Sequence, residues 1–123
     1  MPCKDMVIIM PYINVKVTEK LSCEKQTELK CTLGKAIEAI PGKTETYLMV
    51  CIEDDQKIWF AGDDSKPSAF VDVRILGHAK PEDFSRMTDE LCSVLQTLVG
   101  VAPSRVYVTY AEVENWGWNG RNF

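Results

Sequence analysis

Residues 70–110 read FVDVRILGHAKPEDFSRMTDELCSVLQTLVGVAPSRVYVTY. Apolar and polar residues alternate over residues 70–76, which is the pattern of a strand with one buried face. A stripe of apolar residues at helical spacing follows, with Pro81 suited to a first helical turn and Gly100 suited to the end. Residues 106–110 alternate again, so this stretch predicts a strand, a helix and a second strand.

The first half of the chain repeats this order. Residues 11–17 (PYINVKV) alternate like a half-buried strand, and Ser22 is a good N-cap for the helix that follows. The apolar stripe of this helix consists of Leu29, Leu33, Ala36, Ile37 and Ile40. Pro41 and Gly42 end the helix, and a second strand is predicted over residues 46–52.

Successive β-α-β units predict an α/β fold, more closely an α+β sandwich, in which a four-stranded sheet carries both helices on one face. Between the units we expect a short strand over residues 57–60 and a polar loop over residues 61–68. The opposite face of the sheet would have no cover within one subunit, although the strands carry apolar side chains at both odd and even positions and therefore on both faces. Self-association is the simplest way to bury that face.

Composition and charge exclude several classes of function. The chain has 123 residues, is 46% hydrophobic and carries a net charge of −4. This balance fits one domain, expected over residues 11–123, and argues against nucleic acid or an anionic membrane as a partner. No apolar run is long enough to span a bilayer, and residues 1–10 lack the features of a signal peptide. We therefore expect a cytoplasmic protein.

The five cysteines are widely spaced and form no Cys-x-x-Cys motif, and the chain has a single histidine, His78. Local spacing therefore predicts neither a zinc site nor a dithiol redox centre, and no metal is expected. We expect the thiols to be reduced and mostly buried, and we expect His78 to lie in a surface loop.

The carboxyl-terminal segment, residues 105–123, ends with Trp116, Trp118 and Phe123 on a polar tail that contains glycine. A tail of this composition does not form the core of a helix. Its large aromatic side chains are expected to anchor it against another surface, on the same subunit or on a neighbouring one.

Pro11 interrupts an apolar run that would otherwise read as one long strand, and Met10 directly precedes it. If translation begins at Met10, residues 1–10 are a misassigned start, and removal of the initiator methionine leaves Pro11 as a free secondary amine. Apolar surroundings lower the pKa of such an amine, so that it can remove a proton adjacent to a carbonyl. If residues 1–10 are instead a genuine extension, Pro11 has no basic nitrogen and the chain is catalytically silent.

Several motifs run in order through residues 11–123. They are Pro11-Tyr-Ile-Asn-Val, Pro41-Gly42-Lys43, Trp59-Phe60-Ala61-Gly62, Phe70–Gly77, Arg105-Val-Tyr-Val-Thr-Tyr and Asn115-Trp-Gly-Trp-Asn-Gly. Together they resemble the macrophage migration inhibitory factor family of the tautomerase superfamily, and a microbial member more than an animal one. The carboxyl-terminal motif is the most specific of them.

The resemblance implies a homotrimer whose sheets surround a central channel, with active sites at the subunit interfaces. It also implies a cofactor-independent keto–enol tautomerase of the phenylpyruvate or dopachrome type. The substrate would be a small aromatic 2-oxo acid, and the amino-terminal proline would be the general acid and base. Asp72 and Arg74 share one strand face, where they would line the channel or pair across subunits.

Residue by residue, the resemblance assigns the catalytic proline to Pro11 and the lysine that binds the substrate carboxylate to Lys43. The backbone of Leu76 would contact the substrate, and Tyr107 would come from the adjacent subunit. The remaining pocket residues would be Tyr12, Thr109, Trp116, Trp118 and Phe123. Thr109 stands where the family often has asparagine, and residues 67–70 replace the Cys-x-x-Cys linked to thiol–protein oxidoreductase activity, which we expect to be absent.

An alternative function is binding rather than catalysis. In this interpretation the chain is a mimic of the cytokine that engages a host receptor, and its pocket is vestigial. Such proteins can be released from cells without a signal peptide, so the lack of one is compatible with both functions.

Overall fold

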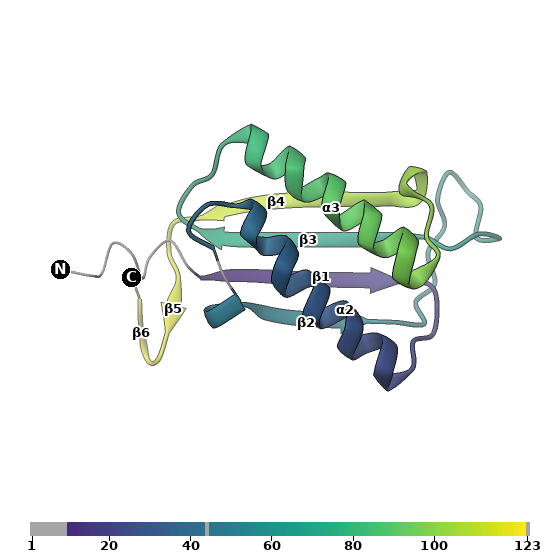
Figure 1. The fold of residues 1–123 in the computed structure, drawn as a ribbon, viewed down its shortest axis with the longest axis horizontal. Coiled ribbons are helices and arrows are strands. Elements are labelled where there is room, and N and C mark those ends of the chain that lie inside the picture. Colours follow the sequence, from purple (N-terminus) through teal and green to yellow (C-terminus); the bar gives the residue numbers. More distant parts are fainter. Residues whose placement is uncertain (1–9, 44, 123) are drawn as a thin grey trace.

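The computed structural model describes residues 10–43 and 45–122, so the predictions for residues 1–9 lie outside it. The main elements are β1 (Pro11–Val17), α2 (Cys23–Ala36), β2 (Met49–Glu53), β3 (Ala69–Leu76), α3 (Pro81–Val99) and β4 (Val106–Val113) (Figure 1). A short hairpin, β5 (Gly117–Trp118) and β6 (Arg121–Asn122), follows them. Single 3-10 turns occupy Ile37–Ala39, Glu45–Tyr47 and Pro103–Arg105.

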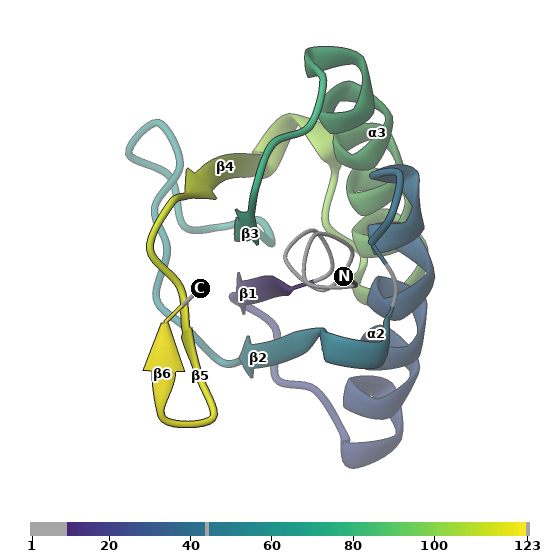
Figure 2. The ribbon, with the colours of Figure 1, turned by 90° about the vertical axis from the view of Figure 1, so that its left-hand side faces the viewer.

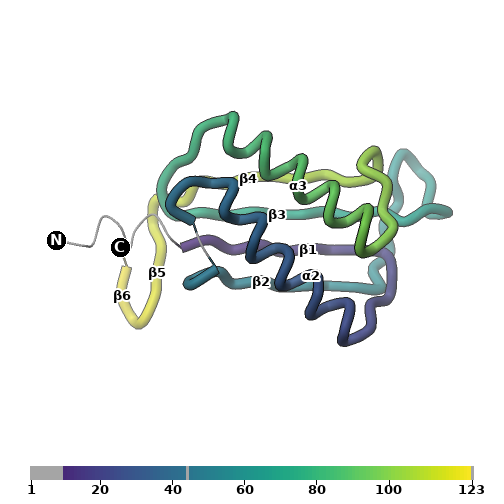
Figure 3. The backbone as a smooth tube through the Cα atoms, in the orientation of Figure 1, coloured from purple at the N-terminus to yellow at the C-terminus, as the bar shows by residue number. Residues whose placement is uncertain are grey.

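The main strands form one sheet of four strands in the order β2-β1-β3-β4. The pairs β1–β2 and β3–β4 are parallel, and the central pair β1–β3 is antiparallel. Both α2 and α3 lie side by side on one face of the sheet (Figures 1 and 3). The predicted pair of β-α-β units is therefore confirmed, with both helices on the same face.

Local signals place the starts of both helices and the end of α3 as expected, whereas α2 ends at Ala36 and the 3-10 turn Ile37–Ala39 precedes Pro41. The Ser22 hydroxyl accepts a hydrogen bond from the Lys25 N–H at 3.1 Å and caps α2. Pro81 occupies the first turn of α3, and Gly100 ends that helix in the left-handed conformation with φ of 79°.

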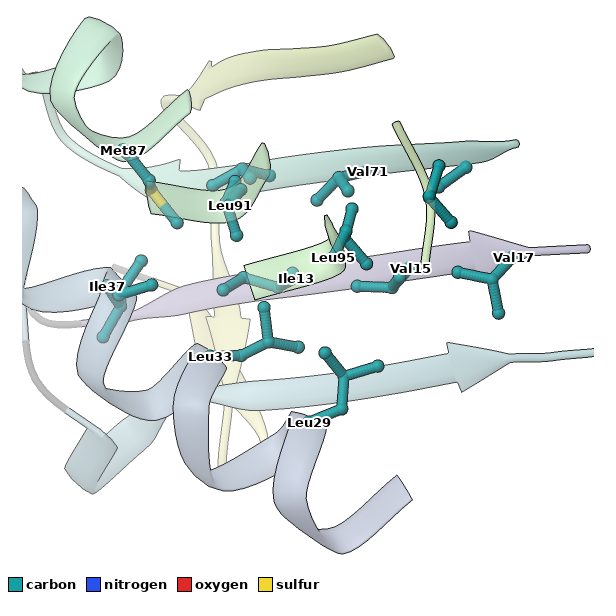
Figure 4. Packing of buried hydrophobic residues seen from close by; sticks show 14 of the residues in the cluster. Ile13, Val15, Val17, Leu29, Leu33, Ile37, Val71, Met87, Leu91 and Leu95 are labelled. Atoms are coloured by element: carbon teal, nitrogen blue, oxygen red, sulfur yellow. The ribbon is translucent and has the colours of Figure 1, made fainter. Parts of the chain in front are cut away.

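The core lies between the helices and the sheet. Its side chains come from the predicted stripes of both helices and from one face of β1 and β3 (Figure 4). The most deeply buried of them are Ile13, Val15, Val17, Leu29, Leu33, Ile37, Ile40, Val71, Ile75, Met87, Leu91 and Leu95. Among the described helices, none combines the length and the apolarity that crossing a membrane requires.

Three expectations are wrong. No strand forms over residues 57–60, where a single bridge joins Phe60 to Asp63 in a tight turn and this segment pairs with neither edge strand of the sheet, β2 or β4. The strand predicted over residues 46–52 begins only at Met49, because Glu45–Tyr47 forms a 3-10 turn. None of the described cysteines is buried. Cys23, Cys31, Cys51 and Cys92 are free and exposed or half-buried.

The second face of the sheet, here called the open face, carries side chains that no helix covers. Strand register aligns them in three rows: Glu53–Lys16–Phe70–Tyr107, Cys51–Asn14–Asp72–Thr109 and Met49–Tyr12–Arg74–Ala111. Met49 and Tyr107 are 66% and 61% exposed, which is unusual for large apolar side chains. Within the described residues of one subunit, this face is uncovered, as expected.

Candidate active site

A cavity of about 700 Å³ lies where the end of the open face meets the carboxyl-terminal hairpin. Figure 2 shows the hairpin beside the ends of β1 and β2, on the side of the sheet away from the helices. The cavity is lined by Met10, Pro11, Tyr12, Thr46, Tyr47, Leu48, Met49, Arg74, Val113, Asn115, Trp116, Gly117 and Trp118. Most of these side chains are aromatic or aliphatic, as is usual in a site for a small organic ligand.

Aromatic rings form the walls of this cavity. Pro11, Tyr12, Trp116 and Trp118, all predicted site residues, meet there. Tyr47, which the sequence analysis did not assign to the site, packs edge-to-face on Trp118 with ring centroids 5.7 Å apart. The sequence predicts that Tyr47 lies in a strand, whereas it lies in the 3-10 turn Glu45–Tyr47 and its ring lines the cavity.

Pro11 is buried at the start of β1, and its nitrogen is part of the peptide bond with Met10. Met10 itself is only 3% exposed and also lines the cavity. Its carbonyl accepts a hydrogen bond from the Leu76 N–H at 3.1 Å, which continues the antiparallel pairing of β1 with β3 by one residue. With Met10 in place, the Pro11 nitrogen is an amide and carries no basic lone pair.

Lys43 is not among the residues that line the cavity. Its side chain is 2% exposed in total, and the ammonium Nζ donates to the Leu76 carbonyl at 3.3 Å. Both backbone groups of Leu76 are therefore engaged, one with Met10 and one with Lys43. Burial lowers the pKa of the Lys43 ammonium from 10.5 to about 8, because desolvation disfavours the charged form.

This burial predicts a pH-dependent cost to stability. The folded pKa lies below the unfolded one, so the unfolded chain binds more protons between about pH 8 and pH 10.5. Stability should therefore rise with pH across this window as the folded lysine loses its charge, by up to about 3 kcal/mol. Urea unfolding at several pH values gives the free energy of unfolding of the wild type and of Lys43→Met, and the rise is the change with pH in the difference between them. Free energies of unfolding that change with pH in the same way in both proteins would contradict the prediction.

Tyr107 and Thr109 lie on the open face of β4 and do not reach the cavity of their own subunit. The Tyr107 ring contacts Phe60 with centroids 5.3 Å apart. The Thr109 hydroxyl donates to the Asp72 carboxylate at 3.1 Å. Phe123 lies outside the described residues.

Arg74 is a lining residue whose role in the cavity the sequence analysis did not foresee. Its guanidinium pairs with the Asp72 carboxylate at 3.4 Å within the same strand. His78 has an 83% exposed side chain, as predicted for a surface loop, and contacts Glu112 at 3.4 Å. In residues 10–43 and 45–122 no group of three or more His, Cys, Asp or Glu side chains is arranged to hold a metal ion.

Comparisons with known proteins agree with this architecture. The family model described as Macrophage migration inhibitory factor matches residues 10–123. The macrophage migration inhibitory factor of Xenopus laevis is 30% identical over 93 residues, which cover 74% of this chain and 80% of that protein. A homolog from Trichinella spiralis is 29% identical over 120 residues, which cover 96% of this chain and 100% of that protein.

Among solved structures, Leishmania major MIF2 superposes with a TM-score of 0.87 and 29% sequence identity. The match covers 94% of this chain and 99% of that one. The family model alone spans nearly the entire sequence, from the residue before β1 to the end of the hairpin segment. This chain therefore belongs to the macrophage migration inhibitory factor family and has its α+β tautomerase fold.

Proposed function

We propose that this chain is a cofactor-independent tautomerase that interconverts the keto and enol forms of small aromatic 2-oxo acids such as phenylpyruvate. The observation that carries the proposal is the cavity of aromatic walls that includes Pro11 at its end. The proposal requires that Pro11 be the free amino terminus, because only then does its nitrogen have a lone pair.

The chemistry needs one base that both accepts and returns a proton. A free Pro11 amine would take a proton from the carbon next to the ketone, leaving an enolate, and the resulting ammonium would then give the proton to the enolate oxygen to form the enol; the reverse reaction runs through the same steps in the opposite order. Burial among apolar groups lowers the pKa of such an amine toward neutrality, so that a useful fraction is unprotonated. Removal of Met10 would also free the Leu76 N–H, which the Met10 carbonyl now occupies, to contact the substrate.

We also propose that the working form is a homotrimer. The open face carries exposed Met49, Phe70 and Tyr107, which a neighbouring subunit would cover. Tyr107 and Thr109 would then reach a neighbour's cavity rather than their own. In support of this, both lie outside the cavity of their own subunit.

Two forms of the chain, one beginning at Met1 and one with Pro11 as its first residue, test the proposal. Intact mass confirms each amino terminus, and phenylpyruvate tautomerisation is then followed under identical conditions. We expect activity only in the form with a free Pro11, at least about 10²-fold above the other, the range of one acid–base group. Equal activity in both forms would contradict the role of Pro11. Silence in both, with native circular dichroism, would contradict catalysis.

A second candidate function is receptor binding in the manner of a cytokine, with a vestigial pocket. It is favoured by one observation, which is that the nitrogen of Pro11 is an amide when Met10 is attached, with Met10 buried and hydrogen-bonded to Leu76. Binding to a host receptor that survives substitution of the cavity residues would support this function over catalysis.

A further inference from the structure

Gly34 lies near the end of α2, inside a helix, where glycine is less favourable than alanine. It is buried, and the side chain of Glu45 lies against it. A Cβ atom at position 34 would be 2.6 Å from the Glu45 Cδ and 2.8 Å and 3.0 Å from its carboxylate oxygens. The Glu45 carboxylate therefore occupies the space that any other side chain at position 34 would take.

A second residue of α2 faces the same carboxylate. Lys30 precedes Gly34 by one helical turn, so the two residues share one face of α2. The Lys30 ammonium lies 3.9 Å from a Glu45 carboxylate oxygen, and the two side chains are 51% and 54% exposed. An ion pair as exposed as this one contributes little by itself. The close fit of Glu45 over Gly34 is therefore the more important part of the contact with α2.

Glu45 is also the first residue of a segment that forms one wall of the cavity beside Pro11. Its carbonyl accepts a hydrogen bond from the Leu48 N–H at 3.0 Å, which closes the 3-10 turn Glu45–Tyr47. The next four residues, 46–49, all line the cavity, whereas Glu45 does not. The turn thus has one end on α2 and the other in the wall of the cavity.

The Tyr47 ring takes its place from this turn. It packs edge-to-face on Trp118, with ring centroids 5.7 Å apart, although no strand pairing joins β2 to the hairpin. We propose that Glu45 is a positioning residue of the cavity. By lying against Gly34 it fixes the 3-10 turn, and the turn holds the Tyr47 ring against Trp118. This deepens the proposed function, on which it rests only in so far as the ring is a wall of the proposed substrate site.

The position of the Tyr47 ring can be measured without catalysis, by NMR of the full chain. The π electrons of an aromatic ring shift the resonances of nuclei beside it, so the indole resonances of Trp118 report the presence of its neighbour. Trp118→Phe identifies these resonances, and Tyr47→Leu gives the shift that marks the loss of the ring. Trp59, which is 59% exposed and does not line the cavity, is an internal reference.

Gly34→Ala is expected to move the Trp118 resonances toward those of Tyr47→Leu, because the new methyl group takes the space of the Glu45 carboxylate. Glu45→Ala should have the same effect. Glu45→Gln keeps the length of the side chain and should leave the resonances near those of the wild type. Gly34→Ala should not lower the urea midpoint, because alanine favours a helix more than glycine does. A general loss of stability would not give this combination.

The double variant Gly34→Ala/Glu45→Ala tests the contact itself. If Glu45 transmits the effect, the double variant should show the shift of Glu45→Ala alone, because the contact can be lost only once. Lys35→Ala is the matched control, since Lys35 is an exposed neighbour of Gly34 on the same helix and does not line the cavity. It should leave the Trp118 resonances unchanged.

A kinetic measurement extends the test to the form of the chain that begins at Pro11. Gly34→Ala should raise the KM for phenylpyruvate about 10-fold, the usual effect of an imperfectly filled contact in an apolar pocket. The kcat should stay close to the wild-type value, because the substitution does not touch Pro11.

Four results would overturn the proposal. One is that the Trp118 resonances are the same in the wild type and in Tyr47→Leu. Another is that Gly34→Ala and Glu45→Ala both leave them unchanged. The third is a double variant in which the two shifts add, and the fourth is an active enzyme whose KM does not respond to Gly34→Ala. An inactive wild type would contradict the proposed function and leave the NMR comparison intact, so the two failures are distinguishable.

Discussion

Replacing Pro11 by glycine, in the form of the chain that begins at residue 11, is expected to lower phenylpyruvate tautomerisation by about 10²-fold or more. Glycine keeps an amino group but loses the ring that fixes the nitrogen relative to the backbone. Because Pro11 is buried at the start of β1, that ring is what holds the nitrogen in the cavity. A freely rotating amine would spend little time at the geometry that proton transfer needs.

The effect should fall mainly on kcat, since the aromatic walls that bind the substrate are unchanged. Pro103→Gly is a matched control, because Pro103 is an exposed proline in the 3-10 turn before β4 and does not line the cavity. It should retain full activity. If Pro11→Gly has wild-type kcat and intact mass confirms its amino terminus, the general base is another group.

Replacing Arg105 by alanine is expected to lower the free energy of unfolding by about 3 kcal/mol, the combined effect of several lost charged hydrogen bonds. Arg105 is 8% exposed and is the last residue of the 3-10 turn that precedes β4. Its guanidinium donates to the Ser68 hydroxyl at 2.9 Å and to the carbonyls of Pro67 at 3.0 Å, Asp63 at 2.7 Å and Lys66 at 3.2 Å. It also lies 5.5 Å from the Phe60 ring centroid.

These contacts hold the loop between the two β-α-β units against the sheet, so their loss should be seen in urea unfolding as a lower midpoint. Arg105→Lys keeps the charge but not the planar fork, and should recover only part of the loss. Arg121→Ala, at an exposed position in β6, should change stability by less than about 0.5 kcal/mol. A loss at Arg105 no larger than at Arg121 would mean that the loop is held by other contacts.

The sequence predicted the fold well wherever the signal was local. The change from alternation to helical spacing placed β3 and α3, and a single serine located the start of α2 at Ser22. The strand predicted over residues 57–60 does not form, because a strand needs a neighbour to pair with, and whether the chain brings a segment alongside an edge strand depends on the whole topology. Cys31 was expected to be buried, yet its position on α2 lies off the Leu29 and Leu33 stripe.

The candidate site was predicted in part. Pro11, Tyr12, Trp116 and Trp118 came from the family motifs, and they meet in one cavity. The alternation of β3 placed Arg74 on the correct face, but it could not show that the hairpin covers that end of the face. Lys43 is buried and donates to the carbonyl of Leu76, which lies far away in the sequence, so no local pattern reveals this placement.

The order of the strands has a consequence for how fast the chain can fold. Each parallel pair is joined through a helix, and the central pair joins residues as distant in sequence as Val15 and Val71. The strands of the main sheet therefore pair residues that are far apart in the sequence. The long segments between paired residues must close into loops, at an entropic cost, before the pairs can form. Chains with such non-local contacts fold slowly, in about milliseconds to seconds, so the isolated subunit should refold well outside the microsecond range of helical bundles.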